Sequence, residues 1–507
     1  MHWLAKWIIG SKVVHAPQHY AMGLRGLPRR IRKLGIIGDS RNTQHYDSLT
    51  VGGTLTVAAD RTFTYALSGI GSGYFEVGAY LNISRAADGH LWICRIGSIV
   101  DANTVAGTIV YANTAALVPG AYTPAAEYMF RSQGHMPYLG TGYLAWALAL
   151  AGQPADAVFA TAYAGGRPNV AGGQVQIDAV IAEGCDEVWS WMGVNNLLDG
   201  TSAATTITYL DAFYDQLRAA GIRVRAIGEN PHASYSVATY AGIKEVNEWL
   251  IDRAASDPEY FDYIDTVGLF RANPSTGVSI SGASWIDASV HPGPLAHRLL
   301  GEVLASRLAA DNYVGRKRLA RTSLEKSSPS VGDLAVQNGS MSVTGVTAFP
   351  YTGAPTNWSS TVNGGSCTKV DRVIRGADGQ NTYEMALTVA ANSTNVYAQG
   401  PTVSCNPGEK FRVRGTLRLS NLVSVDYVRF VLLNNTGGSL FGQALKDASG
   451  AFPDGRNVVL TLQGEGPVVG AGAQDLRVRV HVYFTATAGG AGSCTVQLED
   501  VELERIE

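Results

Sequence analysis

Outside residues 48–135, the chain up to residue 312 alternates between short apolar runs and longer segments with a helical period. Apolar runs that predict buried strands occur at 34–38, 157–160, 187–192 and 224–227. Segments with apolar residues at helical spacing occur at 143–150, 174–183, 207–220, 240–255 and 295–309. Strands buried on both faces read as continuous apolar sequence, and strands that alternate with helices form parallel sheets. The pattern therefore predicts an α/β unit with helices on both faces of a parallel sheet.

Two other regions show the period of two that is typical of strands with one buried face. Residues 48–135 consist of short alternating runs separated by Gly and Asp-Gly turns, which predicts a small antiparallel β unit in place of a helix after Ser40. Residues 331–507 predict an all-β, jelly-roll-like sandwich, and the charged, Ser-rich residues 313–330 predict a linker. The predicted organisation is listed in chain order: a basic arm at 1–30, the α/β unit at 31–47 and 136–312 with the β unit 48–135 inserted, the linker 313–330 and the sandwich 331–507.

Composition and charge exclude several classes of protein. The chain has 507 residues, of which 46% are apolar and 16% charged, and its net charge of −3 gives no general reason to expect a nucleic acid partner. The first 38 residues carry seven Lys and Arg residues and no acid, as expected of a solvated tail or an attachment segment. Lys6 and Lys12 interrupt the apolar start, so no signal peptide is predicted, and no apolar run is long enough to predict membrane insertion.

The five cysteines do not predict a metal site. Their number is odd, no close pair has the spacing of metal ligands, and we expect free thiols. No metal and no cofactor is predicted.

Three polar blocks, which begin at Gly38, Gly193 and Asp287, carry the candidate chemistry. Ser40 follows the first apolar run, where open α/β sheets keep their active sites. A serine hydroxyl needs a base to become a nucleophile, and His291 is the candidate base with Asp287 as the group that orients it. The order Ser, Asp, His is that of hydrolases built on an α/β sheet. The sequence therefore predicts acyl transfer from an ester to water.

An ester hydrolase also needs hydrogen-bond donors for the oxyanion of the tetrahedral intermediate. The candidates are the backbone N–H of Ser40, a backbone N–H of the loop Gly165-Gly166, and the side-chain amide of Asn195. All three belong to loops that follow predicted parallel strands, so the sheet brings them to one edge.

These blocks resemble those of the SGNH hydrolases, the GDSL-like esterase and lipase superfamily. Gly38-Asp39-Ser40 matches the nucleophile block, and Gly193-Val194-Asn195-Asn196 matches Gly-x-Asn-Asp with Asn196 in place of the acid. Gly166 matches the oxyanion glycine, with Gly165 as the alternative. The block Asp-x-x-His is matched by Asp287 and His291 with three intervening residues where the family has two, and His297 is a weaker alternative base.

The resemblance implies a three-layer SGNH fold and a serine esterase that removes acyl groups, O-acetyl above all, from a polysaccharide. The layout with a basic arm and β domains resembles phage tailspike or tail-fibre esterases, which implies an extracellular or virion-associated homotrimer attached through the arm. The sandwich resembles carbohydrate-binding jelly rolls, with Tyr351, Trp358 and Tyr397 as candidate sugar-stacking rings. The alternatives are a secreted bacterial carboxylesterase or lipase and a non-catalytic glycan-binding receptor protein.

Overall fold

The computed structural model describes most of the chain, in segments separated by short gaps. The described residues are 8–9, 12–13, 29–43, 49–50, 52–68, 80–85, 90–101, 103–112, 118–123, 128–132, 142–162, 165–232, 235–270, 291–315, 324–363, 365–376, 380–390, 394–433, 439–446, 455–467, 474–484 and 491–506. Within the predicted basic arm, the short strands β1 (Ile8–Ile9) and β2 (Lys12–Val13) pair antiparallel. No helix among the described residues is long and apolar enough to cross a membrane.

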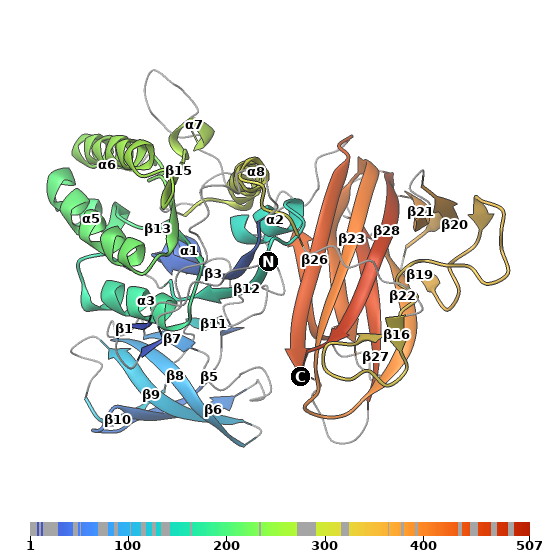
Figure 1. The fold of residues 1–507 in the computed structure, drawn as a ribbon, viewed down its shortest axis with the longest axis horizontal. Helices are drawn as coiled ribbons and strands as arrows, with labels where there is room; N and C mark the ends of the chain where they lie inside the picture. Colours follow the sequence, from blue (N-terminus) through green and yellow to red (C-terminus); the bar gives the residue numbers. More distant parts are fainter. Residues whose placement is uncertain are drawn as a thin grey trace.

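A five-stranded parallel sheet lies at the centre of the α/β unit, which confirms the prediction from the apolar runs (Figure 1). Its strands are β3 (Ile31–Gly38), β12 (Ala155–Ala160), β13 (Glu187–Trp191), β14 (Arg223–Ile227) and β15 (Phe261–Ile264). Their spatial order is β12-β3-β13-β14-β15, and every neighbouring pair is parallel. The strand that comes first in the sequence is therefore second in space, which creates a switch in winding direction beside β3.

Helices cover both faces of this sheet and bury two separate apolar cores (Figure 1). The first face carries α3 (Ala171–Ala182), α5 (Ala203–Ala219) and α6 (Val237–Ser256). The second face carries α2 (Tyr143–Leu150) and α8 (Pro294–Ala310). The single-turn helices are α1 (Ser40–Thr43), α4 (Val194–Leu198) and α7 (Val267–Phe270). The expectation of no helix after Ser40 is wrong by this one turn.

The helix starts show why the apolar pattern places them too late. Ser202 and Ser236 cap α5 and α6, and each Oγ accepts a hydrogen bond from the backbone N–H three residues on, at 3.2 and 3.0 Å. The first turn after such a cap contributes few residues to the core, so apolar periodicity begins a turn after the helix does.

The region after α1 forms an eight-stranded antiparallel sheet of order β10-β5-β6-β9-β8-β7-β11-β4. Its strands are β4 (Leu49–Thr50), β5 (Gly52–Val57), β6 (Thr62–Ser68), β7 (Tyr80–Arg85), β8 (His90–Asp101), β9 (Thr104–Ala112), β10 (Gly120–Tyr122) and β11 (Tyr128–Ser132). Ile93 of this sheet is part of the core beneath α3. The inserted sheet is therefore packed against the α/β unit on the side of α3.

The last third of the chain folds into two sheets that share one apolar core. The larger sheet contains β16 (Glu325–Lys326), β17 (Leu334–Ala335), β18 (Tyr351–Thr352), β20 (Cys367–Arg375), β21 (Asn381–Val389), β23 (Lys410–Val423), β26 (Val458–Pro467) and β28 (Gly492–Arg505). The smaller sheet, of order β19-β22-β27-β24-β25, contains β19 (Ser359–Asn363), β22 (Thr394–Cys405), β24 (Val425–Leu433), β25 (Ser439–Lys446) and β27 (Gln474–Phe484). Trp358 is buried and donates from Nε1 to the Gln337 carbonyl at 2.8 Å, so it cannot stack on a sugar.

Helix α2 joins the sandwich to the α/β unit. Its Trp146 is packed in the sandwich core, whereas Leu144 and Leu148 are packed in the core of the α/β unit. Gln153 Nε2 donates to the Thr461 carbonyl at 2.7 Å, and Arg414 donates to the Gly152 carbonyl at 2.9 Å. The two units thus meet along a packed interface at α2 and β26 (Figure 1).

Candidate active site

The turn that carries Ser40 is fixed by a glycine at the end of β3. Gly38 has φ +139°, and a Cβ atom there would lie 2.3 Å from the carbonyl oxygen of Trp191 on the neighbouring strand. The backbone N–H of Asp39 donates to that same carbonyl at 3.1 Å. Ser40 then begins α1, and the Asp39 carboxylate accepts from the Arg41 N–H at 3.0 Å. The close approach of β3 to β13 therefore requires glycine and places Ser40 at the carboxyl edge of the sheet.

Two side-chain amides hold this turn, that of Gln176 from α3 and that of Asn42 from α1 itself. The Gly38 N–H donates to Gln176 Oε1 at 2.7 Å, and Gln176 Nε2 donates back to the Gly38 carbonyl at 3.1 Å. Asn42 Nδ2 donates to the Ile37 carbonyl at 2.5 Å and accepts at Oδ1 from the Tyr143 hydroxyl at 2.6 Å. Contacts from α3 and α2 thus fix the backbone on both sides of Ser40.

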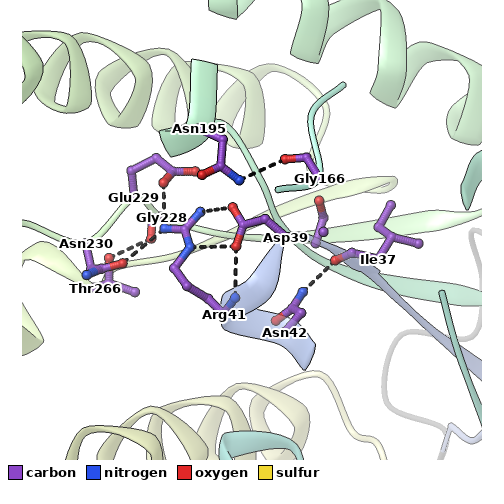
Figure 2. Close-up of polar contacts among 12 residues, drawn as sticks. Ile37, Asp39, Arg41, Asn42, Gly166, Asn195, Gly228, Glu229, Asn230 and Thr266 are labelled. Carbon is purple, nitrogen blue, oxygen red and sulfur yellow. Dashed lines mark hydrogen bonds and ion pairs between the residues drawn. The ribbon is translucent and has the colours of Figure 1, made fainter. Parts of the chain in front are cut away.

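The two other oxyanion candidates lie in contact with each other (Figure 2). The side-chain amide of Asn195 donates to the carbonyl oxygen of Gly166 at 3.2 Å. Asn195 is half-buried, Gly166 is buried, and Gly165 is exposed with φ +75°. These loops follow β12 and β13, the strands on either side of β3. Ser40, Gly166 and Asn195 therefore stand after three adjacent strands, at the switch in winding direction where open α/β sheets bind ligands.

Of the predicted base His291 and its partner Asp287, only His291 is among the described residues. His291 is half-buried and stands three residues before α8. Asp287 lies outside the described residues, so its role stays a prediction. The alternative base, His297, is buried within α8 and stacks on Tyr143, with ring centroids 6.0 Å apart and an interplanar angle of 23°. Because the Tyr143 hydroxyl donates to Asn42, His297 is part of the packing that supports the turn that carries Ser40.

A buried ion network lies directly beside this turn (Figure 2). The Arg41 guanidinium binds both oxygens of Asp39, with Nε to Oδ1 at 2.9 Å and Nη2 to Oδ2 at 2.7 Å. Its Nη1 donates to Glu229 Oε2 at 2.6 Å and to Asn230 Oδ1 at 3.0 Å. The guanidinium also lies over the Trp191 ring, 4.8 Å from the centroid. Arg41, Asp39 and Glu229 are fully buried, so one cation ties the turn after β3 to the turn after β14.

Burial acts in opposite directions on the pKa values of Arg41 and Glu229. Burial lowers the pKa of the Arg41 guanidinium, but the charges of Asp39 and Glu229 outweigh it and the pKa is raised. Burial raises the pKa of Glu229 above its usual range, and the attraction of Arg41 does not fully offset this. Two carboxylates thus share one guanidinium, and the raised pKa of Glu229 favours its neutral form.

The sequence did not reveal Arg41 or Glu229 as site residues, although a signal existed. Glu229-Asn230 follows the strand Arg223–Ile227 closely, just as Asp39-Ser40-Arg41 follows β3. Polar residues at the carboxyl ends of two parallel strands are candidates for contact, and both segments meet this condition. Among the described residues, no cluster of three or more His, Cys, Asp or Glu side chains is arranged to hold a metal ion.

Comparison with known protein families agrees with this geometry. Residues 131–299 match the model of the GDSL-like lipase/acylhydrolase family. This part of the chain is a GDSL-like lipase/acylhydrolase domain. The match begins near the end of the inserted sheet, so it includes Asn195 and His291 but not Ser40. The inserted sheet separates β3 and Ser40 from the matched residues in sequence, while β3 lies between β12 and β13 of the matched region in the parallel sheet.

Solved structures of GDSL proteins are similar to about a third of this chain. A lipolytic protein of the G-D-S-L family from Desulfitobacterium hafniense is 15% identical, with 33% of this chain and 87% of that chain covered at a TM-score of 0.27. The lipase/acylhydrolase from Enterococcus faecalis is 20% identical, with 32% and 78% covered and a TM-score of 0.26. A mutant of Axe2, an acetylxylan esterase from Geobacillus stearothermophilus, is 16% identical, with 37% and 89% covered and a TM-score of 0.30. The comparison with curated proteins gives no match.

The raised pKa of Glu229 predicts how stability depends on pH. A carboxyl group whose pKa is higher in the folded state stabilises the fold below its unfolded pKa, near 4.5, and loses that contribution as pH rises. Glu229→Gln keeps an oxygen for Arg41 and removes the titration. We therefore expect the free energy of unfolding of Glu229→Gln to increase relative to the wild type as pH rises from 4.5, measured by urea unfolding up to pH 8.

Glu187 offers a matched control for this measurement. It is equally buried, but the charges of Arg225 and Arg223 outweigh burial and lower its pKa. Its contribution is lost only as pH falls, so the difference between Glu187→Gln and the wild type should stay constant above pH 4.5. A constant difference for Glu229→Gln as well would contradict the shared-guanidinium arrangement.

Asn195 gives a second prediction for the GDSL-like domain. Asn195→Ala should lower kcat for ester hydrolysis by about 10²- to 10³-fold with little change in KM, because an oxyanion donor bonds most strongly in the transition state. Steady-state kinetics with 4-nitrophenyl acetate measures both constants. Asn169→Ala is a neighbouring control, since Asn169 Oδ1 binds the Asn196 amide at 2.8 Å and not Asn195. An effect on KM alone would make Asn195 a binding residue instead.

Proposed function

We propose that this protein is a serine esterase that removes acyl groups, O-acetyl above all, from a polysaccharide. The observation that carries the esterase proposal is the position of Ser40 after β3, flanked by the Asn195–Gly166 pair from the two adjacent strands. A nucleophile between two sets of amide donors is the arrangement that a tetrahedral acyl intermediate requires.

The proposed reaction proceeds in two acyl-transfer steps. His291 takes the proton of the Ser40 hydroxyl as the serine oxygen attacks the ester carbonyl, and Asp287 orients the imidazole. The oxyanion is stabilised by the Ser40 and Gly166 N–H groups and by the Asn195 amide. The bond between the carbonyl carbon and the sugar oxygen breaks, and His291 protonates the leaving alcohol. An acyl-serine remains. Water, deprotonated by His291, then attacks this ester and releases the carboxylic acid and free Ser40.

Asp39 is not available as the base in this scheme. Both of its carboxylate oxygens are bound by Arg41, at 2.9 and 2.7 Å, and its side chain is fully buried. Its function is to hold Arg41 and to accept from the first N–H groups of α1, which keeps the serine at the start of that turn.

The polysaccharide substrate and the biological setting are supported by architecture alone. The GDSL-like domain carries an inserted β sheet on one side and a β sandwich on the other, which gives a longer surface than a small ester needs. The basic N-terminal arm suits attachment to a larger particle. We therefore propose an extracellular or virion-associated homotrimeric tail protein as the setting.

The test compares polymer and small-ester substrates. Acetate release from O-acetylated polysaccharides should exceed release by the Ser40→Ala protein, and activity on nitrophenyl esters should fall as the acyl chain grows from two to eight carbons. A preference for the longer chains would identify a lipase. Glycan binding without any acetate or nitrophenol release would identify a non-catalytic receptor-binding protein.

A further inference from the structure

The smaller sheet of the sandwich has two faces of opposite character. On β22, β24 and β27, alternate residues point into the apolar core and are fully buried, among them Val396, Ala398, Val428, Phe430, Val480 and Val482. The residues between them lie on the opposite face, and the fully buried Val431, opposite Arg479, is one of them. Nine others on β22, β24 and β27 make up what we name the aromatic–arginine face: Asn395, Tyr397, Gln399, Tyr427, Arg429, Arg477, Arg479, His481 and Tyr483. These residues are half-buried except for the buried His481.

Four rings form a continuous row across three strands of this face. Tyr427 and Tyr483 stack with centroids 3.9 Å apart and an interplanar angle of 16°. His481 lies 5.6 Å from Tyr483 at 12° and 5.4 Å from Tyr397. Strand register explains the row, because Tyr397 is opposite His481 and Tyr427 is opposite Tyr483. None of these four rings belongs to the apolar core of the sandwich.

Cations flank this row. Arg479 lies over the Tyr397 ring, 4.2 Å from its centroid, and donates from Nε to Gln399 Oε1 at 2.6 Å. Arg429 is opposite His481 in the sheet, and Arg477 is two residues before Arg479 on the same strand. The acidic residues of these three strands, Asp426 and Asp475, stand at opposite ends of the face by register. The centre of the face is therefore positively charged.

His481 does not add to this charge. Burial lowers its pKa to about 3, and the neighbouring Arg429 and Arg479 act in the same direction. The imidazole is thus neutral at ordinary pH, with Nδ1 lying 3.2 Å from Asn395 Oδ1. The face presents rings, amides and arginines with no exposed aliphatic cluster, which does not suit an apolar protein partner.

We propose that the aromatic–arginine face binds an acidic polysaccharide. The C–H-rich face of a pyranose ring packs against aromatic side chains, amide side chains bind hydroxyl groups, and a guanidinium binds a carboxylate through two parallel hydrogen bonds. A uronate carboxylate bound to Arg479 brings its own sugar ring next to Tyr397, because that guanidinium is 4.2 Å from the ring centroid. Both neutral sugars and uronates can contact the rings and amides of this face. Only an acidic chain can also form ion pairs with its arginines.

This site goes beyond the proposed esterase, because binding here does not involve Ser40. The GDSL-like domain packs through α2 on β26, a strand of the opposite sheet, so catalysis and binding use different surfaces (Figure 1). A bound polymer would present its ester groups to the active site at a raised local concentration.

The test uses the full-length Ser40→Ala protein, so that binding is measured without hydrolysis. The probes are polygalacturonate, alginate, hyaluronan and polysialic acid, with carboxyl-reduced polygalacturonate and xylan as neutral comparators and single-stranded DNA as a non-glycan polyanion. Isothermal titration calorimetry should show binding to at least one acidic polysaccharide, at least tenfold tighter than to the neutral probes and to DNA. Adding Arg479→Gln and Tyr397→Ala should weaken that binding at least tenfold.

Two controls separate this result from misfolding and from the esterase proposal. Arg418→Gln removes an arginine from the opposite sheet and should change affinity less than twofold. With Ser40 intact, Arg479→Gln with Tyr397→Ala should leave turnover of 4-nitrophenyl acetate unchanged. Failure of all four acidic probes, equal binding by the double variant, or a preference for DNA overturns the proposal. Loss of the esterase activity alone overturns only the proposed function.

Discussion

Replacing Ser40 with alanine will reduce ester hydrolysis by about 10⁴-fold or more, while the protein stays folded. The reason is chemical, since the acyl-enzyme needs this oxygen and the amide donors cannot replace it. Steady-state turnover of 4-nitrophenyl acetate and acetate release from an O-acetylated polysaccharide measure the loss. The thermal midpoint should stay close to that of the wild type, because alanine is compatible with the first position of α1.

A covalent label makes the assignment of Ser40 independent of kinetics. A serine-directed phosphonate should modify Ser40 in the wild type, as read by mass spectrometry of the digested protein, and should not modify the alanine protein. Ser306→Ala is a suitable control, because Ser306 is an exposed serine of α8 whose hydroxyl donates to the Glu302 carbonyl. Full activity of Ser40→Ala, or phosphonate on another serine, would refute the proposed nucleophile.

Arg41→Met will destabilise the fold by about 3–5 kcal/mol and will also lower kcat. Removing the guanidinium leaves Asp39 and Glu229 buried without their cation. Because Asp39 accepts from the Arg41 N–H and its own N–H bonds to Trp191, any movement of this carboxylate displaces the turn that begins with Ser40. Urea unfolding gives the stability, and kcat per folded molecule is measured well below the unfolding transition.

A second buried arginine provides the matched control. Arg225 is also fully buried, and it binds Glu187, Asp262 and Asp311 at 2.5, 2.6 and 2.7 Å. Its partner Glu187 is the first residue of β13, so this network lies at the amino edge of the sheet, away from Ser40. Arg225→Met should cost similar stability with kcat unchanged. Equal kcat values for the two variants would show that Arg41 is structural only.

The elements of the central sheet that could be predicted are those with an unbroken apolar signal. The run at Leu34–Ile37 lies in an interior strand of the sheet, so both of its faces must be apolar. β15 carries no such signal, because it is a short edge strand whose two middle residues, Asp262 and Tyr263, are only half-buried. A strand with one neighbour carries half of the pattern that a central strand shows.

The sequence likewise indicates some residues of the candidate site and not others. Ser40, Gly166 and Asn195 could be proposed because each follows a recognisable strand, and parallel strands bring their ends together. Arg41 is harder to propose from the sequence, because a lone arginine is expected at the surface. Only the three-dimensional contact with Glu229, which is 188 residues away, shows that its charge is neutralised inside the protein.

Two of the candidate sugar-stacking rings have different surroundings in the structure. Trp358 and Tyr397 belong to the same region of alternating sequence, and composition does not distinguish them. One is buried against Gln337, and the other faces outward beside His481. Tyr397 lies within β22, where a shift of one residue exchanges the two faces, so only the pairing shows which way it points. Trp358 precedes β19, and only its contact with Gln337 shows that it is buried.

Helix α2 makes the sandwich an integral part of the enzyme and not an exchangeable appendage. Its Trp146 completes one apolar core while Leu144 and Leu148, on the same two turns, complete the other. A recombination event that replaced the sandwich would leave an indole and its apolar surroundings exposed beside the catalytic sheet. Any substitute domain would have to present a matching apolar surface to α2. The architecture is therefore expected to diverge through changes in surface loops and the outer sheet face, while the joint between the units is retained.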